Sequence, residues 1–130
     1  MAARILVIED EPENRLLIGL VLRNEGYDVL EAEDGTTGLA SAERHRPDLI
    51  LLDVMMPGIN GFEVYERLQQ HPCLRAIPVL MLTALAQRAE IERAVEMGVT
   101  GYLTKPFEPN DLLAAIAGAL ASARERRTAS

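Results

Sequence analysis

Five polar side chains each stand where a short apolar run ends, and they are Glu9, Asp10, Asp53, Thr83 and Lys105. The carboxyl ends of parallel strands meet at one edge of a sheet, so we expect these side chains to converge there. Packed carboxylates repel one another and resist ionisation unless a cation is present, and hard oxygen ligands at an open site suit Mg²⁺. A carboxylate beside such a metal is a competent nucleophile towards phosphorus, which singles out Asp53, while Thr83 and Lys105 could bind phosphoryl oxygens.

Each of these residues also has an ordinary structural interpretation. Asp53 could cap or turn the chain after its strand, because Pro57 and Gly58 follow within a few residues. Thr83 could be a turn hydroxyl, and Lys105 could be a solvated loop lysine. Taken alone, Asp53 leaves the two interpretations about even, but the arrival of all five residues at strand ends favours a shared site.

The hydrophobic pattern predicts the strands that would position these residues. Wholly apolar runs are typical of central strands buried on both faces, and the runs at 5–8, 49–52 and 77–82 fit that description. Shorter strands are predicted at 27–32, with an edge-like alternation, and at 101–104.

Helical signals fall between these strands. Helices are predicted at 14–25, from Asp34 or Thr36 to about 45, from Asn60 or Gly61 to about 71, at 88–97, and from Pro109 onwards. Five strand–helix pairs predict an α/β fold with a parallel sheet and helices on both faces.

Apolar spacing indicates a buried face in four of the predicted helices. The first helix has Leu17, Leu20 and Val21 at helical spacing, with Leu16 alongside. We expect Phe62, Tyr65 and Leu68 to share one face of the third helix, Ile91, Ala94 and Val95 to point inward from the fourth, and Leu112, Leu113, Ile116 and Leu120 to form the stripe of the last.

Composition restricts the class of protein. The 130 residues, 48% of them hydrophobic, suffice for one domain with a full core. A net charge of −7 disfavours nucleic acid as a direct partner. We expect no signal peptide, since the chain enters a strand-like run at once, and no membrane span, since no apolar run approaches about 20 residues. A single cysteine, Cys73, fits a reducing compartment, so the predicted location is the cytoplasm.

Four motifs, in this order, resemble the receiver domain of two-component response regulators of the chemotaxis-regulator type. They are Ile-Leu-Val-Ile-Glu-Asp-Glu at 5–11, Leu-Leu-Asp-Val-Met-Met-Pro-Gly-Ile-Asn-Gly at 51–61, Met-Leu-Thr-Ala at 81–84 and Tyr-Leu-Thr-Lys-Pro-Phe at 102–107. The resemblance implies a flavodoxin-like, doubly wound five-stranded parallel sheet with strand order 2-1-3-4-5. It covers residues 4 to about 122, which divides the chain into a receiver domain at 1–122 and a basic tail or linker stump at 123–130.

The resemblance also implies a metal site and a phosphoacceptor. Asp53 would take a phosphoryl group from a sensor histidine kinase or a phosphotransfer protein. Asp10, Asp53 and the backbone carbonyl of Met55 would bind Mg²⁺, for which Mn²⁺ is expected to substitute, and Glu9 would act through bound water.

Phosphate binding and switching are assigned by the same resemblance. Thr83, Ala84 and Lys105 would bind the phosphoryl group, and the peptide bond before Pro106 would be cis. Thr83 would be drawn to the phosphate while Tyr102 turns inward. The switched surface would comprise roughly residues 87–121, read by a downstream effector protein or a fused output domain, and a dimer formed on phosphorylation is a further expectation.

Two neighbours of the motifs suggest a slow decay of the phosphorylated form. Met55 follows the acceptor by two residues, and Leu85 follows Thr83 by two. In receivers these positions flank the path of the hydrolytic water, and neither side chain here can hydrogen-bond water. We predict slow self-dephosphorylation.

Three other functions fit the sequence less well. A metal-dependent phosphatase or phosphotransferase with an aspartyl nucleophile needs an acid two residues later, where this chain has Met55. Dinucleotide binding needs a glycine fingerprint, which the turn after residue 8 lacks. A receiver-like interaction module that is never phosphorylated is disfavoured by the complete residue set. We expect no enzyme activity beyond the chain's own phosphorylation and slow dephosphorylation.

Overall fold

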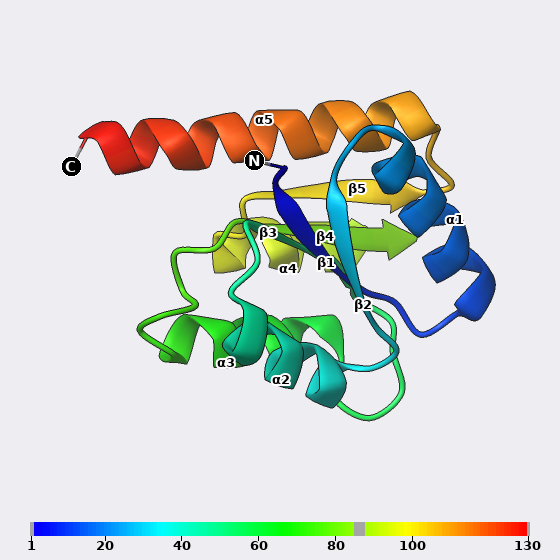
Figure 1. The fold of residues 1–130 in the computed structure, drawn as a ribbon. Coiled ribbons are helices and arrows are strands. Elements are labelled where there is room, and N and C mark those ends of the chain that lie inside the picture. The colour runs from blue at the N-terminus through cyan, green and yellow to red at the C-terminus, as the bar shows by residue number, and fades with distance from the viewer. Residues whose placement is uncertain (1, 85–87, 130) are drawn as a thin grey trace.

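The computed structural model describes residues 2–84 and 88–129, which alternate between five strands and five helices (Figure 1). The strands are β1 (Arg4–Ile8), β2 (Asp28–Ala32), β3 (Leu49–Asp53), β4 (Val79–Ala84) and β5 (Gly101–Lys105). The helices are α1 (Pro12–Asn24), α2 (Gly35–His45), α3 (Gly61–Gln70), α4 (Arg88–Met97) and α5 (Pro109–Ala129). The predicted element types are confirmed, and their ends agree within a few residues.

The strands form one parallel sheet in the order β2-β1-β3-β4-β5, so the predicted topology is confirmed. Helices α1 and α5 cover one face of this sheet, and α2, α3 and α4 cover the other (Figure 1). The winding changes direction between β1 and β3, which are neighbours in the sheet. At such a switch point a crevice opens beyond the carboxyl ends of the strands.

The core consists of two apolar layers, one on each face of the sheet. Along β1 the side chains alternate, with Ile5 and Val7 in the layer under α1 and α5 and Leu6 and Ile8 in the layer under α2 to α4. All five residues of β3 are buried. The end of β3 is therefore held from both faces and by both neighbouring strands.

Two helix starts are fixed by side-chain caps. The Asp34 carboxylate accepts a hydrogen bond from the Thr37 backbone N–H at 2.7 Å at the start of α2. At the start of α3, Asn60 and Glu63 form a capping box, with side-chain-to-backbone distances of 3.0 and 3.2 Å. The second cap fixes the end of the loop that leaves β3.

The predicted apolar stripe of α1 is wrong. Leu17 and Leu20 are 59% and 56% exposed, whereas Ile18 and Leu22 are buried against the sheet. Val21 is partly buried at the edge of the same layer. Apolar residues occur around nearly the whole helix, so their spacing did not determine which side faces the sheet.

The other helices largely match the prediction. Phe62, Tyr65 and Leu68 of α3 are buried, as are Leu112, Ile116 and Leu120 of α5, with Leu113 partly buried. In α4 Ala94 is buried and Ile91 is half-buried, but Val95 is 60% exposed, so its inward placement was wrong.

Helix α5 continues without a break past residue 122 and ends at Ala129, so the predicted 123–130 tail begins as helix. Among the helices of the described residues, none combines the length and apolar character needed to cross a bilayer.

Candidate functional site

The last residue of β3, Asp53, lies at the centre of the crevice edge. It pairs in register with Leu82 of β4, and its neighbour Leu52 pairs with Ile8 of β1. Because the strand is covered on both faces, only 4% of Asp53 is exposed. The sequence pattern predicted this placement, and the structure confirms that the carboxylate stands where β1, β3 and β4 meet.

The segment that leaves β1 brings two more carboxylates to Asp53. Glu9 is fully buried and Asp10 is half-buried. One carboxylate oxygen from each of Glu9, Asp10 and Asp53 lies within 4.8 Å of the others. Such a set of hard oxygen donors fits Mg²⁺, which commonly takes one or two carboxylates and keeps several waters.

Lys105, at the end of β5, bridges two of these carboxylates. Its ammonium nitrogen lies 3.1 and 3.2 Å from the two Glu9 carboxylate oxygens and 3.3 Å from Asp53 Oδ1. The Lys105–Pro106 peptide bond is cis, as predicted. Asn14 also donates from Nδ2 to Glu9 Oε1 at 3.1 Å, so the buried Glu9 is held by two donors.

Crowding of carboxylates makes the site costly to ionise. Burial, followed by hydrogen bonding and repulsion from Glu9, raises the pKa of Asp53 to about 8, although Lys105 acts in the opposite direction. Burial by itself would lower the pKa of Lys105, but Asp53 and Glu9 outweigh it and raise that pKa. The single Lys105 ammonium does not balance the charge of three ionised carboxylates. A bound cation would therefore stabilise their ionised forms.

The hydroxyl of Thr83 is buried close to Asp53 and available to bind a ligand. Thr83 lies one residue beyond the level of Asp53 on the neighbouring strand β4 and pairs with Thr104 of β5. The residue is 1% exposed, and within the described part of the chain its Oγ1 has no hydrogen-bond partner. A buried hydroxyl without a partner costs about 1–3 kcal/mol, so an acceptor or donor supplied by a ligand would relieve it.

The remaining predicted residues surround this centre. Ala84 ends β4 and is exposed, while Leu85 lies outside the described residues. Met55 is 63% exposed, and its backbone N–H lies 3.4 Å from Asp53 Oδ1. Tyr102 of β5 is 43% exposed, so it stands outward rather than inward. The prediction that the Met55 carbonyl binds a metal stays a prediction.

Two residues that support Asp53 and Glu9 were missed by the sequence interpretation. A Cβ atom at Gly61 would lie 2.6 Å from the Asp53 backbone oxygen and 2.8 Å from Val54 Cα, so only glycine allows this close approach. Arg15 donates to the backbone oxygen of Glu9 at 2.7 Å. A glycine at a helix start and an arginine on a helix are common, and neither residue type signals such a role.

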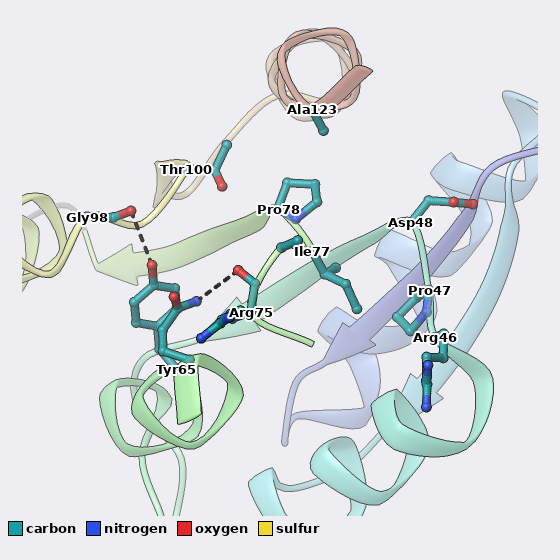
Figure 2. A pocket seen from close by; sticks show the side chains of 12 residues that line it. Arg46, Pro47, Asp48, Tyr65, Arg75, Ile77, Pro78, Gly98, Thr100 and Ala123 are labelled. Carbon is teal, nitrogen blue, oxygen red and sulfur yellow. Dashed lines mark hydrogen bonds between the residues drawn. The ribbon is translucent and has the colours of Figure 1, made fainter. Parts of the chain in front are cut away.

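A pocket of about 540 Å³ lies at the opposite edge of the sheet (Figure 2). Asp48 and Pro78, which precede β3 and β4, line it together with Tyr65 of α3 and Thr100 before β5. The Tyr65 hydroxyl is turned to the Gly98 carbonyl, at 3.1 Å. Because β3 separates the two edges, this pocket takes no part in the carboxylate site.

The chain is similar in sequence and in structure to known response regulators. The family described as "response regulator receiver domain" matches residues 5–117. The chain is 46% identical over 116 residues to the response regulator PleD of Caulobacter vibrioides and 42% identical over 116 residues to the phosphate regulon transcriptional regulatory protein PhoB of Escherichia coli. Each match covers 89% of this chain, but only 26% of PleD and 51% of PhoB, so the chain spans about a quarter to a half of these relatives. The chemotaxis protein CheY4 of Vibrio cholerae superimposes with a TM-score of 0.86 at 33% identity, over 92% of this chain and 99% of that one.

Proposed function

Because the chain belongs to the receiver domain family of two-component response regulators, we propose that Asp53 is its phosphoacceptor and that phosphorylation switches its surface. The observation that carries the proposal is the convergence of Asp53 with Glu9, Asp10 and Lys105 at one edge of the sheet. The donor would be a phosphohistidine of a sensor kinase or phosphotransfer protein. A cytoplasmic location follows from that partner and is part of the proposal.

Glu9, Asp10 and Asp53 would hold Mg²⁺ or Mn²⁺, with the Met55 carbonyl as a further ligand. When bound, the metal supplies positive charge that neutralises the oxygens of the transferring phosphoryl group. The support is the donor set itself, three carboxylates with oxygens within 4.8 Å of one another, of which Glu9 and Asp53 contact the Lys105 ammonium.

In the transfer step a carboxylate oxygen of Asp53 forms a bond to phosphorus. The bond between phosphorus and the donor imidazole nitrogen breaks, and its electron pair stays with the imidazole. Lys105 would move from its contacts with Glu9 and Asp53 to the phosphoryl oxygens, and the Ala84 backbone N–H would donate to them as well. Ionisation of Asp53 is a requirement, so anything that lowers the raised pKa of this carboxyl favours the reaction.

The switch would start at Thr83. Its buried Oγ1 would donate to a phosphoryl oxygen, which satisfies a hydroxyl that has no partner among the described residues. Tyr102 would then turn inward from its exposed position. The surface formed by α4, β5 and α5 would change with it and be read by an effector protein, a fused output domain or a second copy of the chain. The chain would act on no other substrate.

The test is the intact mass of the protein after incubation with a small acyl phosphate, with and without Mg²⁺. We expect one Mg²⁺-dependent phosphoryl adduct on the wild-type chain and none on Asp53→Asn. Asp48→Asn is a matched control, because Asp48 precedes the opposite end of β3 and its carboxylate accepts from the Arg4 backbone N–H at 2.8 Å. An adduct that persists in Asp53→Asn would refute Asp53 as the acceptor. Absence of any adduct, also with a phosphorylated histidine donor, would favour an unphosphorylated interaction module.

A further inference from the structure

The guanidinium of Arg15, on the first turns of α1, reaches back to the segment that carries two of the site's carboxylates. Arg15 Nη1 donates to the Glu9 backbone oxygen at 2.7 Å and lies 3.5 Å from the Asp10 backbone oxygen. These are the two carbonyls next to the point where the chain leaves β1. Only 18% of the Arg15 side chain is exposed, so its contacts are shielded from water.

A carboxylate from β2 holds Arg15 in place on its other side. Arg15 Nε lies 3.6 Å from Glu31 Oε1, and the second Glu31 oxygen, Oε2, is 2.8 Å from Arg23 Nη2. A Cβ at Gly19 would lie 2.9 Å from Arg23 Nη1 and 3.6 Å from Glu31 Oε2, so this ion pair packs directly over the glycine. Glu31 thus contacts two arginines, and within the described part of the chain only Arg15 of the two also donates to the Glu9–Asp10 backbone.

Among the described residues the Glu9 backbone makes one further hydrogen bond, in which its N–H donates to the Ala32 carbonyl at 3.1 Å. Beyond this bond the chain must turn from β1 into α1 while it aims two carboxylates at one point. The planar Arg15 guanidinium, held by Glu31, limits the orientations that the Glu9 and Asp10 carbonyl groups can adopt. Partners of this kind, which orient ligands without touching the metal, commonly change metal affinity by about 10–100-fold.

We propose that Arg15 is a positioning residue that fixes the Glu9–Asp10 backbone so that both carboxylates face the metal site. This proposal rests on the proposed function in one respect, that Glu9 and Asp10 serve a divalent cation. It assigns Arg15 no contact with the metal or with the phosphoryl group.

The charge of Arg15 and its positioning role predict opposite changes in Mg²⁺ affinity when Arg15 is replaced. Arg15 is a cation near a cation site, so loss of its charge alone would tighten Mg²⁺ binding. Loss of the two backbone contacts would weaken binding, because the ligands would no longer be aimed in advance. The sign of the change therefore separates the two roles.

The experiment compares Arg15→Met, Arg15→Lys and the control Arg23→Met by calorimetric titration of the full chain with Mg²⁺ alone. Arg23→Met removes an arginine that pairs with the same Glu31 but, in the described part of the chain, makes no hydrogen bond to the Glu9–Asp10 backbone. We expect the Mg²⁺ dissociation constant to rise about tenfold in Arg15→Met, less in Arg15→Lys, and by about twofold or less in Arg23→Met. An unchanged or lower constant in Arg15→Met would overturn the proposal.

A second measurement works without metal and separates failure of this proposal from failure of the proposed function. In chelator, amide hydrogen exchange at Asp10 and Glu11 should be faster in Arg15→Met than in Arg23→Met, with thermal midpoints measured alongside. Equal exchange in the two variants would overturn the positioning role, whether or not the wild-type chain binds Mg²⁺. Failure of the wild-type chain to bind Mg²⁺, with faster exchange in Arg15→Met, would instead count against the proposed metal site.

Discussion

Replacing Asp53 with asparagine should stabilise the metal-free protein, and the gain should grow with pH. Burial, and then Glu9, raise the pKa of Asp53 from 3.8 to about 8 on folding. The folded protein therefore holds a proton that the unfolded chain releases, and stability is lost as pH rises between these two values. Asparagine keeps the shape of the side chain and has no proton to lose.

The size of the effect follows from the same pKa difference. Each pH unit between 3.8 and about 8 costs about 1.4 kcal/mol, which sets an upper limit of about 6 kcal/mol. The pKa of about 8 already includes the favourable effect of the Lys105 ammonium, 3.3 Å from Asp53 Oδ1, and relaxation of the site around the ionised carboxylate reduces the cost further. We expect Asp53→Asn to be more stable than wild type by about 2–3 kcal/mol at pH 8 and by about 1 kcal/mol at pH 5.

Urea unfolding followed by circular dichroism, in chelator, measures this difference, and it suits a chain without tryptophan. Mg²⁺ should then raise the stability of wild type and leave Asp53→Asn nearly unchanged, since binding to the folded state stabilises it by mass action. The control Asp48→Asn should gain nothing between the two pH values. A gain of Asp53→Asn that is equal at pH 5 and pH 8, or a loss at pH 8, would refute the electrostatic reasoning.

Three further predictions concern other parts of the molecule. Gly61→Ala should lower the free energy of unfolding by about 1–3 kcal/mol and slow phosphorylation, because its Cβ would meet the backbone of Asp53. Gly118→Ala, whose Cβ would have nothing within 4 Å, should have neither effect. Urea titration measures the stability, and intact mass measures the phosphorylation. Met55→Asn should shorten the phosphoryl half-life about tenfold, because an amide side chain at this exposed position can hydrogen-bond the attacking water. A phosphoryl lifetime of seconds in the wild-type chain would contradict the prediction of slow decay. Leu22→Ala should cost about 2–5 kcal/mol and Leu20→Ala about 0.5 kcal/mol or less in urea unfolding, and equal costs would contradict the observed orientation of α1.

The carboxylate site shows how far residue patterns reach. Asp53 and Glu9 could be placed from sequence because an apolar run that ends on a carboxylate is a local signal, and parallel strands deliver their ends to one edge. Lys105 could be placed for the same reason, although it lies 96 residues from Glu9 along the chain. Its bridge between two carboxylates could not be predicted, because that geometry depends on how the strands are staggered.

The sequence by itself determined the order of elements, the parallel sheet and the residues at the crevice, because periodicity, turn residues and helix caps act over a few neighbouring positions. The strand order 2-1-3-4-5 was implied by the resemblance to receiver domains and not by these local patterns. Tertiary structure alone decided which side of α1 meets the sheet, burying Ile18 and Leu22 and leaving Leu20 exposed. It also placed Arg15 against the Glu9 backbone and Gly61 against Asp53. These outcomes depend on how whole elements pack, and in a helix that is apolar on most sides no local pattern distinguishes the buried face.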